Sequence, residues 1–296
     1  MLLFLFHCSS GPQLKVENPA PGKEYVGDNE DKISERTLEL MINSIKEKAK
    51  QNNTIVRRDA HPKHHGCVSG KFTVLDSVPE ELKAGVFAKP ESYDTWMRFS
   101  NGATDPGRDD KGDIRGAGIK LLGVKGDKIL ENKKKAKTQD FLLISHTVLP
   151  VGDPQEYLDL FEAAIEKRIM GYFFGWNPFA WKLSALGKVR AIRGKTIPNM
   201  LEIRYWSTTP YRLGNKLAVK YSIIPCGGER KDMPDTSEEN YLRNEMKKTL
   251  DGGEACFNFM VQKQGDPKEF PVEDPSYEWN EEVSPFIKVA EIKIPS

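Results

Sequence analysis

Short segments rich in β-branched and aromatic residues, separated by turn residues, constrain the fold of this chain most. Four of them lie between residues 68 and 149: "VSGKFTVLD", "DTWMRFSN", "RGAGIKLLGV" and "TQDFLLISHTVL". Four more lie between residues 201 and 294: "LEIRYWS", "LAVKYSIIPC", "ACFNFMVQKQ" and "FIKVAEIKI". Such runs, bounded by Gly, Pro, Asn or Asp, are typical of β-strands. The sequence therefore predicts about eight strands in two groups.

Apolar residues at helical spacing predict the elements between these strands. The candidate helices cover residues 31–52, 153–175, 177–194 and 237–250, and the second and third have a proline near their start. About eight antiparallel strands can close into a barrel that is just wide enough to enclose one ligand. We therefore predict one α+β domain, an antiparallel β-barrel of about eight strands with inserted helices.

The composition excludes several other classes of protein. The 296 residues are 38% hydrophobic and 29% charged, which is ordinary for a globular domain with a core. The net charge of +1 gives no global basic bias, so we expect no nucleic-acid partner. Residues 126–137 carry a lysine run that we expect to be a solvated loop. Whether the chain forms a homo-oligomer stays open.

The N-terminus and the cysteines bear on the compartment. Residues 1–30 are predicted to be a flexible lead-in, and "MLLFLFHCSS" resembles the end of a bacterial lipoprotein signal with Cys8 as the lipidated residue. The run is short and has no positive residue before it, so an exported periplasmic lipoprotein and a cytoplasmic protein both stay open. The other cysteines are far apart and form no CxxC, so we predict no disulfide framework.

The stretch "RDAHPKHHGC", residues 58–67, concentrates groups that carry protons or bind metals. It holds three of the five histidines and one cysteine: His61, His64, His65 and Cys67. Zinc would need three or four converging ligands. Pro62 and Gly66 instead indicate a turn leading into a strand, so we expect no structural zinc here. A polar turn and a turn with one functional histidine remain.

Five motifs in sequence order favour the functional histidine. They are Arg58-x-x-His61, "WMRFSN", "DIRGAGIKLL", "DFLLISHTVLPVGD" and "VEDPSYEWNEEVSPFIKVAEIKI". Their order and spacing, from about residue 58 to 295, resemble the catalase superfamily, and in particular the small bacterial catalase-like haem-binding proteins. The resemblance implies a catalase-like barrel for residues 31–296.

The resemblance also implies roles for single residues around a haem b. His61 corresponds to the catalytic acid–base histidine, and Ser100 would hydrogen-bond its imidazole. The arginines of the first three motifs would hold the haem propionates by charge-assisted hydrogen bonds; they are Arg58, Arg98 and Arg115. Ser145 stands on the fourth strand where catalases have an asparagine, so a peroxidase role is expected rather than high catalase turnover.

The expected function is therefore that of a haem-binding enzyme acting on hydrogen peroxide or organic hydroperoxides. The alternative is a non-catalytic barrel that binds haem or another hydrophobic ligand. The two differ in their needs, because an enzyme requires both His61 and an iron ligand, whereas a carrier requires only a cavity.

No iron ligand can be transferred from the resemblance. Catalases ligate haem iron through a tyrosinate, which in the family follows the closing strand in an Arg-x-x-x-Tyr helix. This sequence stops at "AEIKIPS", so the domain is expected to lack that helix and to bind haem weakly. "RYWSTTPYRLG", residues 204–214, offers Tyr205 and Tyr211, but its position predicts a barrel strand.

Overall fold

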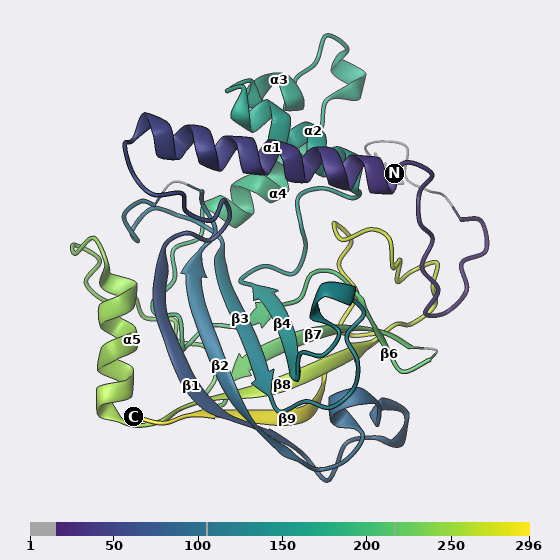
Figure 1. Cartoon of the computed structure of the whole chain (residues 1–296), viewed down its shortest axis with the longest axis vertical. Coiled ribbons are helices and arrows are strands. Elements are labelled where there is room, and N and C mark those ends of the chain that lie inside the picture. Colours follow the sequence, from purple (N-terminus) through teal and green to yellow (C-terminus); the bar gives the residue numbers. More distant parts are fainter. Residues whose placement is uncertain (1–15, 105, 216) are drawn as a thin grey trace, which may run out of the picture.

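A closed antiparallel barrel forms the centre of the computed structural model, which describes residues 16–104, 106–215 and 217–296 (Figure 1). The strands are β1 (His64–Val74), β2 (Ser92–Asn101), β3 (Arg115–Leu122), β4 (Thr138–Ile144), β5 (Tyr205–Trp206), β6 (Tyr211–Leu213), β7 (Leu217–Pro225), β8 (Ala255–Lys263) and β9 (Ile287–Ile294). Each strand from β1 to β4 pairs with the next, β9 pairs with β1, and β5 joins β4 to β7. The predicted eight-stranded α+β barrel is confirmed, with β6 as an additional hairpin strand on β7.

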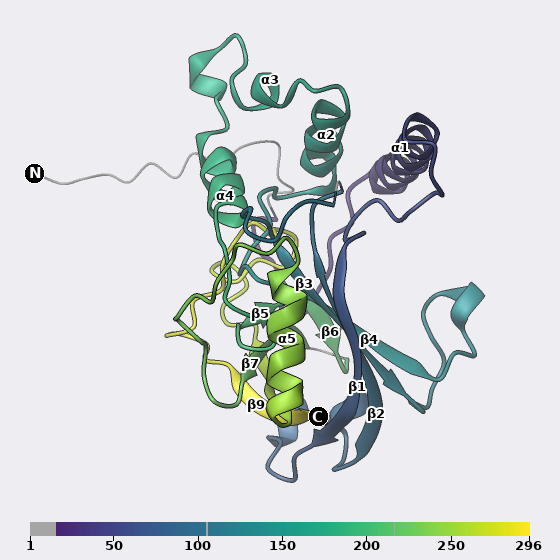
Figure 2. The same cartoon turned by 90° about the vertical axis from the view of Figure 1, so that its left-hand side faces the viewer.

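Helices cover one end and one side of the barrel. They are α1 (Glu30–Gln51), α2 (Pro154–Ile165), α3 (Ile169–Phe173), α4 (Leu183–Arg193) and α5 (Tyr241–Gly252), with short 3-10 turns η1 (Glu80–Leu82), η2 (Gly85–Phe87), η3 (Glu131–Lys133) and η4 (Pro178–Ala180). Helices α1 to α4 gather beyond one end of the barrel, and α5 lies along its outside (Figures 1 and 2). None of the helices in the described ranges is long and apolar enough to cross a bilayer.

The two helices predicted between β4 and β5 are each interrupted. Asp153 caps α2 by accepting a hydrogen bond from Glu156 N at 2.7 Å, and Pro154 occupies the first turn. The chain then leaves helical geometry at Lys167, where φ is +57°, before the short helix α3. Similarly, the extended backbone of Trp181 separates η4 from α4. The result is a helical lobe of short elements, which periodicity alone had merged.

Aromatic side chains fill the barrel interior. Phe72, Phe87, Phe141, Tyr221 and Phe259 are at most 6% exposed, and their ring centroids lie 4.8–6.4 Å apart. Burying one such side chain stabilises a fold by roughly 1.5–3 kcal/mol. Because these rings occupy the interior, the barrel does not enclose a ligand here, and a binding site has to lie at its rim or outside it.

The described part of the N-terminal segment lies against the barrel. Gly22 N donates to Gln264 Oε1 at 2.8 Å, and Tyr25 N donates to Glu273 Oε1 at 2.6 Å. These contacts tie residues 20–25 to the connection between β8 and β9. Cys8, and with it the predicted lipoprotein signal, lies outside the described residues.

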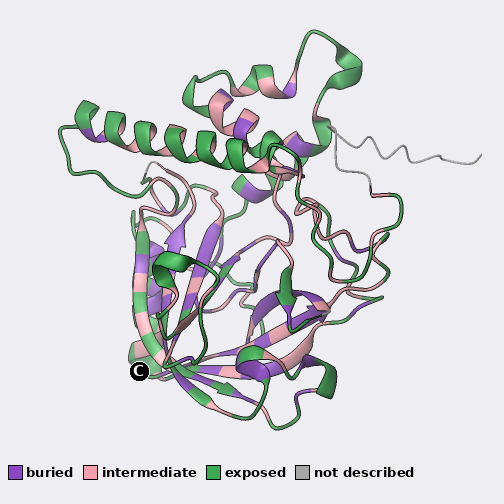
Figure 3. Cartoon of the chain, turned by 45° about the vertical axis from the view of Figure 1, so that its right-hand side comes forward, coloured by how far each residue is buried: buried purple, intermediate pink, exposed green. Residues whose placement is uncertain are grey.

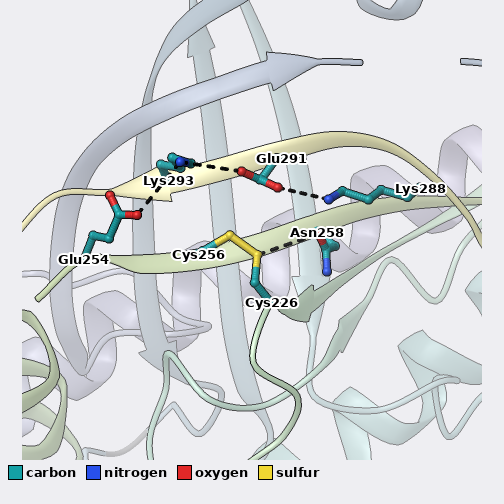
Figure 4. The surroundings of a disulfide bond; sticks show 7 residues. All are labelled: Cys226, Glu254, Cys256, Asn258, Lys288, Glu291 and Lys293. Carbon is teal, nitrogen blue, oxygen red and sulfur yellow. Dashed lines mark hydrogen bonds and ion pairs between the residues drawn. A yellow bond between two sulfur atoms is a disulfide. The ribbon is translucent and has the colours of Figure 1, made fainter. Parts of the chain in front are cut away.

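A disulfide joins Cys226 and Cys256 at adjoining ends of β7 and β8 (Figure 4). Their Cα atoms are 5.4 Å apart, and Cys226 N donates to Cys256 O at 3.0 Å. The sequence predicted no disulfide framework, and the structure adds one disulfide that this prediction did not include. The pairing of β7 with β8 brings together two cysteines that are 30 residues apart, and spacing along the sequence carries no sign of it.

Candidate functional site

His61 is held in an uncommon backbone conformation just before β1. Its φ is +59°, in the left-handed region that few non-glycine residues adopt. Its N–H donates to Gly102 O at 3.3 Å, and its carbonyl accepts from Arg98 Nη2 at 2.7 Å. Such strain persists only where the surroundings hold it, and it is concentrated at functional sites. The backbone of His61 is therefore fixed from both sides by the β2 region.

The imidazole of His61 lies against Gly116 on β3. A Cβ atom at Gly116 would be 2.5 Å from Cε1 and 2.7 Å from Nδ1 of the ring, closer than carbon atoms approach one another. Only glycine leaves room for the ring, so the glycine of the Arg-Gly pair in the third motif allows His61 to pack against β3. On the same ring, Nδ1 lies 3.1 Å from the hydroxyl of the buried Ser100. The structure thus brings His61 and Ser100 together.

The electrostatic surroundings keep this imidazole neutral. Burial, followed by the positive charges of Arg58 and Arg98, lowers the pKa of His61 below its ordinary value, while Asp113 acts in the opposite sense. A neutral imidazole is the form that can accept a proton. Because Nδ1 is hydrogen-bonded to Ser100, Nε2 is the ring nitrogen that can accept the proton.

His65, four residues on, belongs to a buried network that the sequence did not suggest. Its Nε2 lies 2.7 Å from Asn101 Oδ1, and its Nδ1 lies 3.6 Å from the carboxylate of Asp109. Lys63 Nζ contacts the same carboxylate at 2.7 Å, and Arg115 donates to Asn101 Oδ1 and to the Asp109 carbonyl. We call these five residues the Asp109 network. It ties β1, β2 and β3 to the loop before β3.

Asp109 also reaches α5, because its Oδ2 accepts the backbone N–H of Leu242 at 3.2 Å. Asp109 itself is completely buried in a loop rich in Gly, Asp and Lys. Such a composition is typical of exposed turns, so no signal in the sequence marks this residue as buried.

The protonation of His65 should make stability depend on pH. Burial lowers the pKa of His65 to about 4, against the attraction of Asp109. The ordinary value in an unfolded chain is about 6.5. Between these values the unfolded chain binds a proton that the folded chain does not, so stability falls as the pH falls from about 6.5 to about 4. Urea unfolding across this range should show a flatter decline for His65→Gln.

The exposed neighbour His64 supplies the control for this experiment. His64→Gln should retain the decline of the unchanged protein between pH 6.5 and 4 more closely than His65→Gln does. Equal slopes for the protein and the His65 variant would contradict the assignment of the buried imidazole as neutral.

Two other predicted site residues lie in or beside the Asp109 network. Arg115 is completely buried, and besides the bonds above it donates to Lys111 O at 3.1 Å. Its backbone N–H donates to the hydroxyl of Ser145 at 2.9 Å, and Ser145 is buried as well. A propionate contact by Arg115 stays a prediction, which would require the network to open. No hydrogen bond links Ser145 to His61 within the described ranges.

The two candidate iron ligands lie on strands, as their segment predicted. Tyr205 in β5 is completely buried, and its hydroxyl donates to Met200 O at 2.8 Å. Burial raises the pKa of Tyr205 well above its ordinary value, which disfavours a tyrosinate. Tyr211 in β6 is 39% exposed, and its ring lies 5.5 Å from that of Tyr221. Neither arrangement supports iron ligation.

The histidine cluster does not converge on one point. His61 faces Ser100, His65 faces Asn101, and His64 is exposed at the start of β1. Strand β1 begins at His64, earlier than predicted, so Gly66 lies inside the strand. The register between β1 and β2 is irregular between His64 and Gly66. In the part of the chain that the structure describes, the one group with three converging metal-ligand atoms is Cys226, Cys256 and Glu291. Because its two sulfurs are bonded to each other, they are not thiolate ligands.

A separate cavity of about 750 Å³ lies outside the barrel interior. Its walls come from residues 21–24, the start of α2, residues 209–212 and the loop at Val272, Glu273 and Pro275. Tyr157 and Tyr211 add aromatic surface, and neither His61 nor Ser100 contributes to the lining. The cavity and the His61 site are therefore distinct.

Neither a family model nor a curated protein sequence matches this chain. Solved structures do match its fold. Catalase A from Saccharomyces cerevisiae has a TM-score of 0.65 at 18% identity, with 86% of this chain and 55% of that chain covered. A fungal catalase gives 0.62 at 14% identity, covering 86% and 53%. A bacterial catalase gives 0.56 at 16% identity, covering 99% and 58%.

The identities are low, so the match concerns the fold. The chain spans slightly more than half the length of these catalases. The five sequence motifs lie on strands β1 to β4 and β9 of the closed eight-stranded barrel, or directly beside them. The protein therefore has the barrel fold of the catalases.

Proposed function

We propose that this protein binds haem b beside His61 and acts on hydrogen peroxide or organic hydroperoxides as a peroxidase or catalase-type oxidoreductase. One observation carries the proposal, namely the neutral imidazole of His61, fixed by its backbone contacts, by Gly116 and by Ser100. A polar turn without function would not require an imidazole ring that packs where only a glycine leaves room.

The residues around His61 fit a carboxylate-bearing haem. Arg58 is exposed and Arg98 is half-buried, and both act electrostatically on His61, so two guanidinium groups lie near its ring. Guanidinium groups bind carboxylates such as propionates through paired hydrogen bonds. Bound haem would supply the iron centre at which peroxide is reduced. Arg58, Arg98 and His61 would thus form one side of the haem site.

The chain's own contribution would be to move one proton. His61 Nε2 would accept it from a hydroperoxide oxygen and return it to the departing oxygen, as a general acid–base group. Ser100 would hold Nδ1 so that the ring keeps its orientation. The lowered pKa of His61 would keep the base form available at neutral pH.

The optical spectrum of the purified protein with added haemin tests this proposal directly. A saturable shift of the haem absorption band, together with peroxide-dependent oxidation of a dye, is the expected result. A spectrum identical to that of free haemin at all protein concentrations would contradict it.

Gly116→Ala is expected to lower peroxide turnover by about tenfold to a hundredfold while leaving haem affinity nearly unchanged. The added methyl group would force the His61 ring from its position, and small displacements of catalytic groups have costs of this order. Gly118→Ala, two residues along β3, is the matched control, because its nearest atom would be an ordinary 3.8 Å away. Equal turnover in both variants would argue against the His61 geometry.

The 750 Å³ cavity favours a second candidate, a non-catalytic protein that binds haem or another hydrophobic ligand. The filled barrel interior leaves this outer cavity as the place for such a ligand. If haemin binds there, Tyr211→Ala should weaken its binding and His61→Ala should have no effect. If His61→Ala instead lowers peroxide turnover and Tyr211→Ala leaves it unchanged, the result favours the enzyme.

A further inference from the structure

The helical lobe between β4 and β5 ends in an exposed group of aromatic and aliphatic side chains. Trp176 and Phe179 are fully exposed, at 106% and 98% of their reference areas, and Met170, Trp181 and Leu183 are 41–58% exposed. We call these five residues the aromatic tip. The loop before η4 lies at the end of the molecule's long axis, away from the barrel (Figures 1 and 2). Figure 3 shows η4 as exposed from a third direction.

The tip is a hydrogen-bonded turn. Asn177 Oδ1 accepts from Phe179 N at 3.0 Å, and Trp181 Nε1 donates to Gly175 O at 3.0 Å. The Phe174 ring packs edge-on against Trp181 at 5.2 Å. These contacts order the backbone of the turn and the Trp181 ring before binding, which reduces the conformational entropy lost on binding. Large apolar side chains exposed together on one short segment indicate an interaction site.

The charge of the segment that carries the tip, residues 167–201, indicates the chemistry of its partner. Residues 167–201 contain seven basic residues and no acidic ones, in a chain with 44 basic and 43 acidic residues overall. The seven are Lys167, Arg168, Lys182, Lys188, Arg190, Arg193 and Lys195. Lys182 lies over the Tyr172 ring and Lys188 bonds Ser276 O. Arg168 pairs with Glu166, and the acidic residues of the lobe lie on and beside α2. Lys167, Arg190, Arg193 and Lys195 are exposed, so the segment that carries the tip favours an anionic partner.

A second copy of the chain fits this surface poorly. A symmetric dimer contact through the tip would place two copies of the same basic segment against each other. An anionic bilayer satisfies both features at once, because Trp is enriched at the bilayer interface and basic residues attract acidic headgroups. We infer that the aromatic tip inserts into the interfacial region of an anionic membrane while the basic residues of the lobe contact its headgroups. This inference does not depend on haem binding.

Sedimentation with lipid vesicles tests the inference on the full chain. The unchanged protein should bind vesicles containing about one third phosphatidylglycerol at least tenfold more strongly than pure phosphatidylcholine vesicles, since each basic residue near the surface adds about fivefold. Trp176→Ala with Phe179→Ala should reduce binding by roughly a hundredfold, because both buried aromatic contacts are lost. Lys167→Asn with Arg190→Gln should reduce the preference for anionic vesicles and spare the weak binding to neutral ones.

Ile129→Ala is the matched control, because Ile129 is 97% exposed in a lysine-rich loop beside η3, away from the lobe. It should bind vesicles like the unchanged protein. Residues 1–15 are the same in every variant, so any contribution they make cancels. Circular dichroism melts should be unaltered in the tip variant, since its two side chains are exposed.

Several results would overturn the inference. They are no binding to anionic vesicles, equal loss in the Ile129 variant, and a dimer in solution that the tip variant dissociates. Binding of the tip to single-stranded DNA in preference to vesicles would also overturn it, because aromatic residues among basic ones can stack on bases.

Discussion

His61→Ala is expected to slow haem-dependent peroxide turnover by roughly a hundredfold to ten-thousandfold, the usual contribution of a general acid–base group. The variant loses the proton acceptor that Gly116 and Ser100 position, and nothing else in that contact can replace it. Haem affinity should change little, because this residue is assigned to proton transfer and not to the iron. Steady-state peroxide turnover and a haemin titration on the same preparation measure the two effects separately.

His64→Ala is the control for this experiment, since His64 is exposed and lies only three residues away. It should retain nearly full turnover. A His61 variant with an unchanged rate would refute the assignment of the acid–base role. A variant that loses haem as well as activity would instead assign His61 to binding.

Asp109→Ala is expected to destabilise the fold by about 3–5 kcal/mol, the usual effect of removing one partner from a buried charge pair. It would leave Lys63 without its carboxylate at 2.7 Å and Leu242 N without its acceptor. The completely buried Arg115 would lose the nearby negative charge as well. Denaturation by urea, followed by far-ultraviolet circular dichroism, measures the difference in free energy of unfolding.

The neighbouring Asp110 provides the comparison. It is exposed and pairs with Arg108 on the surface, so Asp110→Ala should cost less than about 1 kcal/mol. Asp109→Asn should fall between the two alanine variants, because an amide oxygen can still accept one hydrogen bond. If the variants at 109 and 110 were equally stable, the buried network would not be a source of stability.

Most of the barrel could be predicted from the sequence, but the bounds of the strand that closes it could not. Strands β1 to β4 and β7 to β9 are runs of 7 to 11 residues, most of them rich in β-branched and aromatic side chains, which local pattern captures. Strand β5 is only Tyr205–Trp206, although the apolar pattern covered residues 201–207. Leu201 and Ile203 are buried but form no backbone pairing with β4, because an apolar side chain can be buried without its backbone joining a sheet. The three-residue strand β6 is too short to show any period.

At the site, the order of the motifs was enough to anticipate that His61 and Ser100 would meet. What could not be anticipated was the distinction among similar residues. His61 and His65 are four positions apart, yet one lies against a glycine of β3 and the other enters a buried ionic network. Likewise, Arg98 contacts the His61 backbone while Arg115 faces Asp109. These differences depend on strand register and on a distant loop, neither of which is encoded locally.

The Cys226–Cys256 bond makes the stretch between its two ends a covalent ring that contains α5. Most of residues 227–240 are exposed, and exposed loops are preferred sites of proteolytic nicking. A cut there would leave both pieces linked through sulfur and held together by the β1–β9 and β7–β8 ladders. A nicked molecule should therefore migrate as one band in electrophoresis without reductant and as two bands with it, and should keep its shape in solution until it is reduced and unfolded.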